Sequence, residues 1–234
     1  PCPDRENNGT AGCPSTVYEV NGGTLMEGTR VVITDMIVTG AGEDGFYAQL
    51  DEMSADFNGL DFSGIYVYAP GAMTQPMRGD RVTVDGGIGS FQGGIQIVDP
   101  AVTVDGGGMS PMPTMVAQDD LVRMGSKGEA YEGLLVQISM ATVADVSKYD
   151  NFGEIGLASG LSVDDTLFAF AKPEVNDNYS SIVGCVSYRD FYGENGNNGI
   201  APRDENDLVT GPADLLGFDN ATTFLEAGVT GEQV

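Results

Sequence analysis

Histidine and tryptophan are both absent from this chain of 234 residues, and basic residues are scarce. Without histidine the chain cannot build a Ser-His-Asp or Cys-His catalytic arrangement, a histidine-ligated zinc site or an imidazole base that titrates near pH 7. The 10 Lys and Arg stand against 35 Asp and Glu, which gives a formal net charge of −25. This charge repels nucleic acid and anionic membrane surfaces, so we expect neither as a partner.

Long hydrophobic runs are also missing. No apolar run approaches the roughly 20 residues of a membrane-spanning helix, so we expect no membrane insertion. Hydrophobic residues still make up 41% of the chain, which is enough to build a core. Glycine, with 34 residues, is present at about twice its ordinary usage.

Cysteine is sparse, with three residues in all. Cys2 and Cys13 bracket a short polar loop, and we predict a disulfide between them, which implies an oxidising compartment and a secreted protein. Cys185 lies in the apolar run 182–186 and is predicted to be a small buried hydrophobic residue.

Three triplets fit the N-glycosylation pattern, and their acceptor residues are Asn8, Asn178 and Asn220. Chance is the alternative for each triplet, because an Asn- and Gly-rich chain produces such patterns readily. The sequence therefore predicts a glycoprotein, with these three asparagines as the candidate attachment sites.

The segment 4–9 resembles the start of an acidic calcium loop. Asp4, Glu6 and Asn8 supply oxygen atoms at alternate positions ahead of a glycine. Ser15 stands where a bidentate Glu would close such a loop, and Asn8 cannot readily serve both a metal and a glycan. Calcium is the only cofactor that the sequence suggests, and none is required.

Short alternating or apolar runs, separated by Gly, Asp and Asn, dominate the chain and predict an all-β fold. A first set of strands is expected at residues 30–39, 45–50, 64–69, 80–86 and 94–98. A Gly/Pro connector and a short helix at 117–124 follow. The pattern then repeats, with strands expected at 131–146, 153–158, 166–170, 181–188 and 198–203.

Two sets of five strands, each opening on a long bent strand, predict two tandem five-stranded OB-like Greek-key barrels with N- and C-terminal arms. The expected boundaries are an arm at 1–26, barrels at 27–105 and 117–213 joined by a linker at 106–116, and an arm at 214–234. A fused β-sandwich is the alternative architecture.

Several stretches resemble the tandem OB-fold region found upstream of the catalytic domain in secreted bacterial nucleases of the endonuclease/exonuclease/phosphatase class. Together they span about residues 27–210, and they comprise 45–51, 63–70, 79–84, 90–96, 131–136, 153–155, 200–204 and 207–208. The resemblance implies this fold and a secreted location. It implies no activity, because the catalytic part of that family depends on His with Asp, Asn and Glu and is absent here.

Tyr66 and Tyr68 are the candidate ligand-stacking residues. Strand alternation places them on one face, opposite Ile65 and Val67. Exposed aromatic residues of OB folds can stack on bases or sugars, and the charge of this chain disfavours nucleic acid, which leaves a carbohydrate. The alternative is an ordinary set of cross-strand pairs.

The arms suggest a function. Residues 15–20 alternate like a strand, and such an arm can add to an exposed sheet edge of a neighbouring copy. Repeated head to tail, this contact gives an open homopolymer, so we predict a non-enzymatic, secreted structural subunit of a filament or surface layer. Alternatively, the arms fold back on their own barrels. The other hypotheses are an extracellular binding module for a glycan or another ligand, and the non-catalytic fragment of a secreted nuclease.

Overall fold

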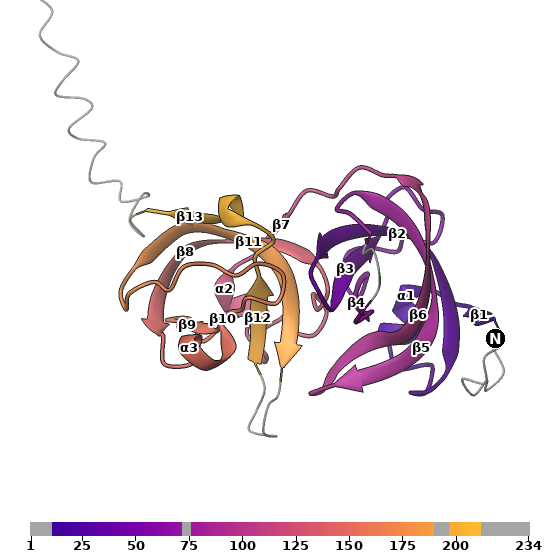
Figure 1. The fold of residues 1–234 in the computed structure, drawn as a ribbon, viewed down its shortest axis with the longest axis horizontal. Coiled ribbons are helices and arrows are strands. Elements are labelled where there is room, and N and C mark those ends of the chain that lie inside the picture. Colours follow the sequence, from indigo (N-terminus) through magenta and orange to yellow (C-terminus); the bar gives the residue numbers. More distant parts are fainter. Residues whose placement is uncertain (1–10, 72–75, 190–196, 212–234) are drawn as a thin grey trace, which may run out of the picture.

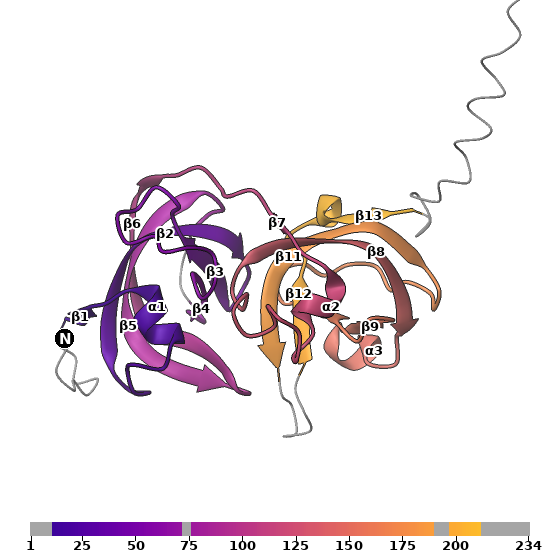
Figure 2. The same cartoon turned by 180° about the vertical axis from the view of Figure 1, so that it is seen from behind.

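The computed structural model describes residues 11–71, 76–189 and 197–211. These residues form a mostly β structure with two lobes that lie side by side (Figures 1 and 2). No helix in this part of the chain is long and apolar enough to cross a membrane.

The elements of the first lobe are β1 (Cys13–Pro14), α1 (Val17–Asn21), β2 (Arg30–Ala41), β3 (Gly45–Leu50), β4 (Gly64–Tyr68), β5 (Asp80–Phe91) and β6 (Gly94–Gly107). Those of the second lobe are β7 (Thr114–Met115), α2 (Gln118–Leu121), β8 (Leu135–Asp145), α3 (Tyr149–Phe152), β9 (Ile155–Leu157), β10 (Ser162–Val163), β11 (Asn178–Arg189), β12 (Asn197–Ala201), the 3-10 helix η1 (Glu205–Asp207) and β13 (Leu208–Thr210).

The first lobe is a closed barrel of five strands. β2 pairs antiparallel with both β3 and β5, β3 pairs with β4, β4 runs parallel to β6, and β6 pairs with β5. β2 is irregular at Asp35, whose φ is +59°, and the register of its pairing with β5 shifts there, between Ile33 and Met36. Apolar side chains such as Val38, Phe46, Val67 and Ile97 are fully buried inside the barrel.

The second lobe repeats this order of pairing. β8 pairs antiparallel with β9 and β11, β9 pairs with β10, β10 runs parallel to β12, and β12 pairs with β11. The bend also recurs at the same offset. Met140 has a φ of +52° and lies five residues after the start of β8, as Asp35 lies five residues after the start of β2.

The repeat extends upstream of the long strands. β1 runs parallel to β2 with Cys13 opposite Val31, and β7 runs parallel to β8 with Thr114 opposite Val136. A short helix begins four residues after the first residue of each short strand. Val17 and Val20 of α1 are buried in the core of the first barrel. Residues 11–26 are therefore part of the first lobe rather than an arm that projects from it.

Most of the expected strands are confirmed, but two expectations are wrong. Residues 15–20 form no strand, because Thr16 and Glu19 make a reciprocal capping box that starts α1. The third strand of the second lobe is the two-residue β10 rather than residues 166–170, which form no strand. The expected helix at 117–124 is present as the shorter α2, and β6 continues through Gly107 into the expected linker.

Candidate functional site

The two lobes share a buried apolar contact. Tyr47 of β3 packs with Leu135, Cys185 and Ala201 of the second lobe, and all four side chains are buried. The backbone N–H of Leu135 donates a buried hydrogen bond of 3.2 Å to the Oε1 atom of Gln49. The apolar contact and the buried hydrogen bond favour a single arrangement of the two lobes, because a shift between them would leave the buried N–H and Oε1 groups without partners.

Polar contacts reinforce this interface. The N–H of Phe62 donates to the carbonyl oxygen of Ala130 at 2.7 Å, and the Lys127 ammonium lies 2.9 Å from a carboxylate oxygen of Asp61. On another side, the guanidinium of Arg203 donates to the carbonyl oxygen of Thr39 at 3.4 Å. The lobes are thus joined at several separate points.

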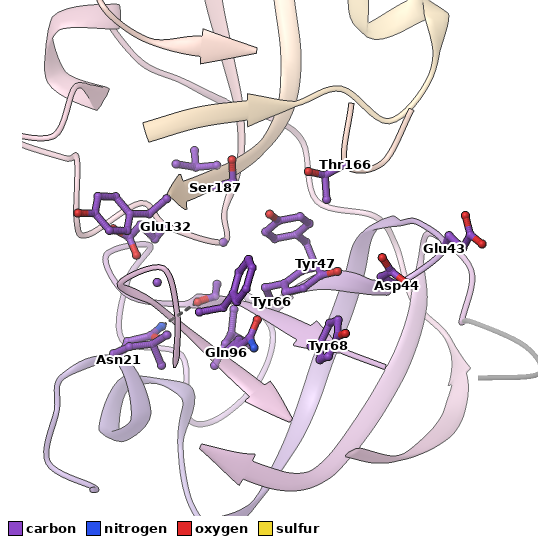
Figure 3. A pocket seen from close by; sticks show the side chains of 18 of the residues that line it. Asn21, Glu43, Asp44, Tyr47, Tyr66, Tyr68, Gln96, Glu132, Thr166 and Ser187 are labelled. Carbon is purple, nitrogen blue, oxygen red and sulfur yellow. Dashed lines mark hydrogen bonds between the residues drawn. The ribbon is translucent and has the colours of Figure 1, made fainter. Parts of the chain in front are cut away.

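A cleft of about 510 Å³ opens between the lobes (Figure 3). Tyr66 and Tyr68 reach it from β4, whereas Thr166 and Ser187 reach it from the second lobe. We call this cavity the main cleft. Its volume is in the range of small-molecule binding sites, about 300–1,000 Å³.

The tyrosines of β4 lie in the main cleft as the alternation predicts. Ile65 and Val67 are 3% and 0% exposed in the barrel core, while Tyr66 is half-buried and Tyr68 is 39% exposed. The ring of Tyr66 lies 4.7 Å from that of Tyr47, between centroids, at a tilt of 48°. A Cβ at Gly45 would lie 2.9 Å from the Tyr66 hydroxyl, so this glycine leaves the space that the ring occupies.

The charged residues that line the main cleft are acidic: Glu43, Asp44, Glu132 and Asp165. Glu132 is half-buried, and burial together with the charge of Glu129 raises the pKa of Glu132 to about 7. Titratable groups whose pKa is shifted by burial in a cleft are typical of functional sites.

A second cavity, here called the side recess, adjoins the main cleft and shares Asn21, Ile95, Glu132 and Tyr188 with it. The guanidinium of Arg123 lies 5.6 Å from the centroid of the Tyr188 ring. This ring therefore already accepts one cation on its face.

Asn198 also lines the side recess and is 1% exposed. Its amide nitrogen donates to the carbonyl oxygens of Leu121 and Gly128, at 2.7 and 2.6 Å. Its Oδ1 atom is buried and has no hydrogen-bond partner in the part of the chain that the structure describes. An unsatisfied buried acceptor is uncommon in native proteins and needs an explanation.

Five predicted site residues belong to stretches that the structure does not describe. Cys2, Asp4, Glu6, Asn8 and Asn220 lie outside the described residues, so the calcium loop and two of the glycosylation positions stay predictions. Cys13 is buried at the start of β1, and its disulfide with Cys2 stays a prediction. Within the described ranges, no group of three or more Cys, Asp or Glu side chains could hold a metal ion.

Asn178, the remaining predicted glycan acceptor, begins β11 and is half-buried. Its Oδ1 atom accepts a hydrogen bond of 2.7 Å from Thr142, and its Nδ2 atom donates to the Asn176 carbonyl oxygen at 3.1 Å. A glycan on Nδ2 would compete with the second of these bonds.

The prediction of a buried Cys185 is confirmed. Its side chain is fully buried, and burial raises the pKa of the thiol to about 12. A thiol that remains protonated at neutral pH and out of contact with solvent is a poor nucleophile.

Sequence reasoning missed Glu132, Tyr188 and Asn198. Glu132 precedes Gly133 and the short apolar run 134–136, and this was the only local signal of its burial. Nothing in the local sequence distinguishes Asn198 from the surrounding Asn and Gly residues. Comparison of the chain with protein-family models, curated proteins and solved structures found no match to any of them.

Proposed function

We propose that this protein is a secreted, non-catalytic binding module of two OB-like barrels, which takes a small ligand in the main cleft between them. The observation that carries the proposal is the cleft itself, a cavity of about 510 Å³ with tyrosines on one wall and polar groups from both lobes around it.

The pairing orders support the OB-like description. In each lobe a long bent strand pairs on both sides, and the third and fifth strands of the set run parallel. A five-stranded Greek-key barrel of this kind commonly binds its ligand on one exposed strand face with the adjoining loops. Tyr66 and Tyr68 lie on such a face here.

The proposal that the protein is not an enzyme rests on the absence of histidine and on the burial of Cys185. The chain has no histidine, the commonest general base of enzymes. Cys185 is fully buried, and its raised pKa keeps the thiol protonated.

Self-assembly through the arms is less well supported. The described part of the N-terminal segment pairs with β2 and packs Val17 and Val20 into the core of its own barrel, which favours the alternative in which this arm folds back. The rest of the filament hypothesis concerns residues 1–10 and 214–234, which lie outside the described residues.

Binding of oligosaccharides and other small molecules to the full chain, measured on a glycan array and by thermal shift, tests the proposal. Tyr68→Ala should weaken binding of any ligand found by about two- to twelvefold, because one aromatic contact contributes about 0.5–1.5 kcal/mol. Phe152→Ala is the matched control, because Phe152 is an exposed aromatic residue that does not line the cleft. A ligand whose affinity is unchanged by Tyr68→Ala and Tyr66→Ala would bind elsewhere and contradict the proposal.

A further inference from the structure

We propose that the ligand of the main cleft is an organic cation, an ammonium or guanidinium compound, held by the Glu132 carboxylate and the faces of the cleft tyrosines. This inference rests on the proposed binding function and names the chemical class of the ligand.

The first argument is the sign of the charge around the cavity. Among the described residues that line the main cleft, Glu43, Asp44, Glu132 and Asp165 are charged, and no Lys or Arg is present. The cleft lies in a chain with a net charge of −25. A concave surface with charge of one sign concentrates ligands of the opposite sign and disfavours an anion.

The second argument is that the Glu132 carboxylate lacks a partner. No described residue forms an ion pair or a hydrogen bond with it, although eight other carboxylates among the described residues are paired with Lys or Arg. A half-buried carboxylate without a partner is costly, and a cationic ligand would supply the missing charge. A neutral sugar would leave this charge uncompensated.

The third argument comes from the side recess, where two carboxylates and a buried amide oxygen are hydrogen-bond acceptors. Asn198 directs its amide nitrogen to two carbonyl oxygens, which leaves the buried Oδ1 atom without a donor. Glu129 and Glu132 line the same recess. Arg123 is the basic residue there, and it lies over the ring of Tyr188. A ligand rich in N–H groups can donate to the carboxylates of Glu129 and Glu132.

The fourth argument is the aromatic surface. Figure 3 shows Tyr47, Tyr66 and Tyr68 along the wall of the first lobe, with Glu132 near the opposite wall. Aromatic faces attract ammonium and guanidinium groups by about 0.5–2 kcal/mol. Tyrosines on one wall and a carboxylate near the other are thus suited to an organic cation, and the size of the cleft fits a molecule rather than a bare ion.

Calorimetric titration of the full chain with spermidine tests this inference. Its matched neutral probe is 1,8-octanediol, and a soluble neutral oligosaccharide is titrated in parallel. We expect saturable one-to-one binding of spermidine and none of the diol. Glu132→Gln should weaken spermidine binding by about tenfold or more, since it removes the charge that faces the ligand.

The control variant is Glu52→Gln, which removes the same charge from an exposed position that does not line the cleft. Equal effects of the two variants would mean that spermidine is attracted only by the net charge, and would overturn the inference. Binding of the oligosaccharide but not of spermidine, with loss in Tyr68→Ala, would also overturn it while the proposed binding function stands. A cleft that binds none of the probes would count against both proposals.

Discussion

At the scale of single residues, Glu132 is the most informative side chain. Its neighbours across the cavities include Glu129, Arg123 and Tyr188, and burial with the charge of Glu129 raises its pKa to about 7. An acid with a higher pKa in the folded than in the unfolded protein binds its proton more tightly when folded. Its contribution to stability is therefore present at low pH and lost as the pH rises.

We therefore expect Glu132→Gln to remove this loss. As the pH rises from about 4.5 to about 7, the wild-type protein should lose about 1–3 kcal/mol of unfolding free energy that the variant retains. Urea unfolding at pH 5 and pH 8 measures the difference, which should appear at pH 8.

Glu52→Gln controls for the simple loss of one negative charge, because Glu52 is exposed. If both variants gain the same stability at pH 8, general charge repulsion rather than burial of Glu132 explains the effect.

At the scale of elements, a close backbone contact holds β4 against the segment before β8. A Cβ added at Gly64 would lie 2.4 Å from the carbonyl carbon of Gly133, and one added at Gly133 would lie 2.4 Å from the backbone nitrogen of Ile65. Gly133 also has a φ of +82°. These glycines let the lobes approach at the edge of the main cleft, which both residues line.

Gly64→Ala should therefore push the lobes apart. We expect a loss of about 1–3 kcal/mol in unfolding free energy, the usual cost of adding a methyl group where there is no space. Cys185, buried in the contact between the lobes, provides a second measurement, because its reaction with a thiol reagent should become faster in the variant.

Gly107→Ala is the matched control, since a Cβ at Gly107 meets no atom within 4 Å and its φ is not in the left-handed region. A Gly64→Ala protein that is as stable as this control, with an equally protected thiol, would refute the proposed role of the glycine contact.

At the scale of the whole molecule, like charges oppose the compact state. The net charge is −25, and most ion pairs of the described residues involve partly exposed side chains, which contribute little to stability. Salt screens the repulsion between the excess carboxylates more than it weakens these few pairs.

We thus expect sodium chloride to raise the melting temperature. A gain of about 1 kcal/mol corresponds to about 2–4 °C for a chain of this size, and differential scanning calorimetry at low and high salt measures it. Chloride is preferred to sulfate, because sulfate also strengthens apolar burial. A melting temperature that falls with added chloride would show that attractive pairs outweigh the repulsion.

The sequence by itself determined the all-β class, most strand positions and the acidic character, because these follow from alternation, turn residues and counts of charge. It also placed Tyr66 and Tyr68 on the outer face of their strand. The assignment of residues 1–26 to an arm followed sequence order, whereas the tertiary structure packs Val17 and Val20 into the first barrel. Only the structure brings Glu132, Tyr188 and Asn198 together with the β4 tyrosines around adjoining cavities, because residues far apart in the sequence become neighbours only when the chain folds and the lobes pack.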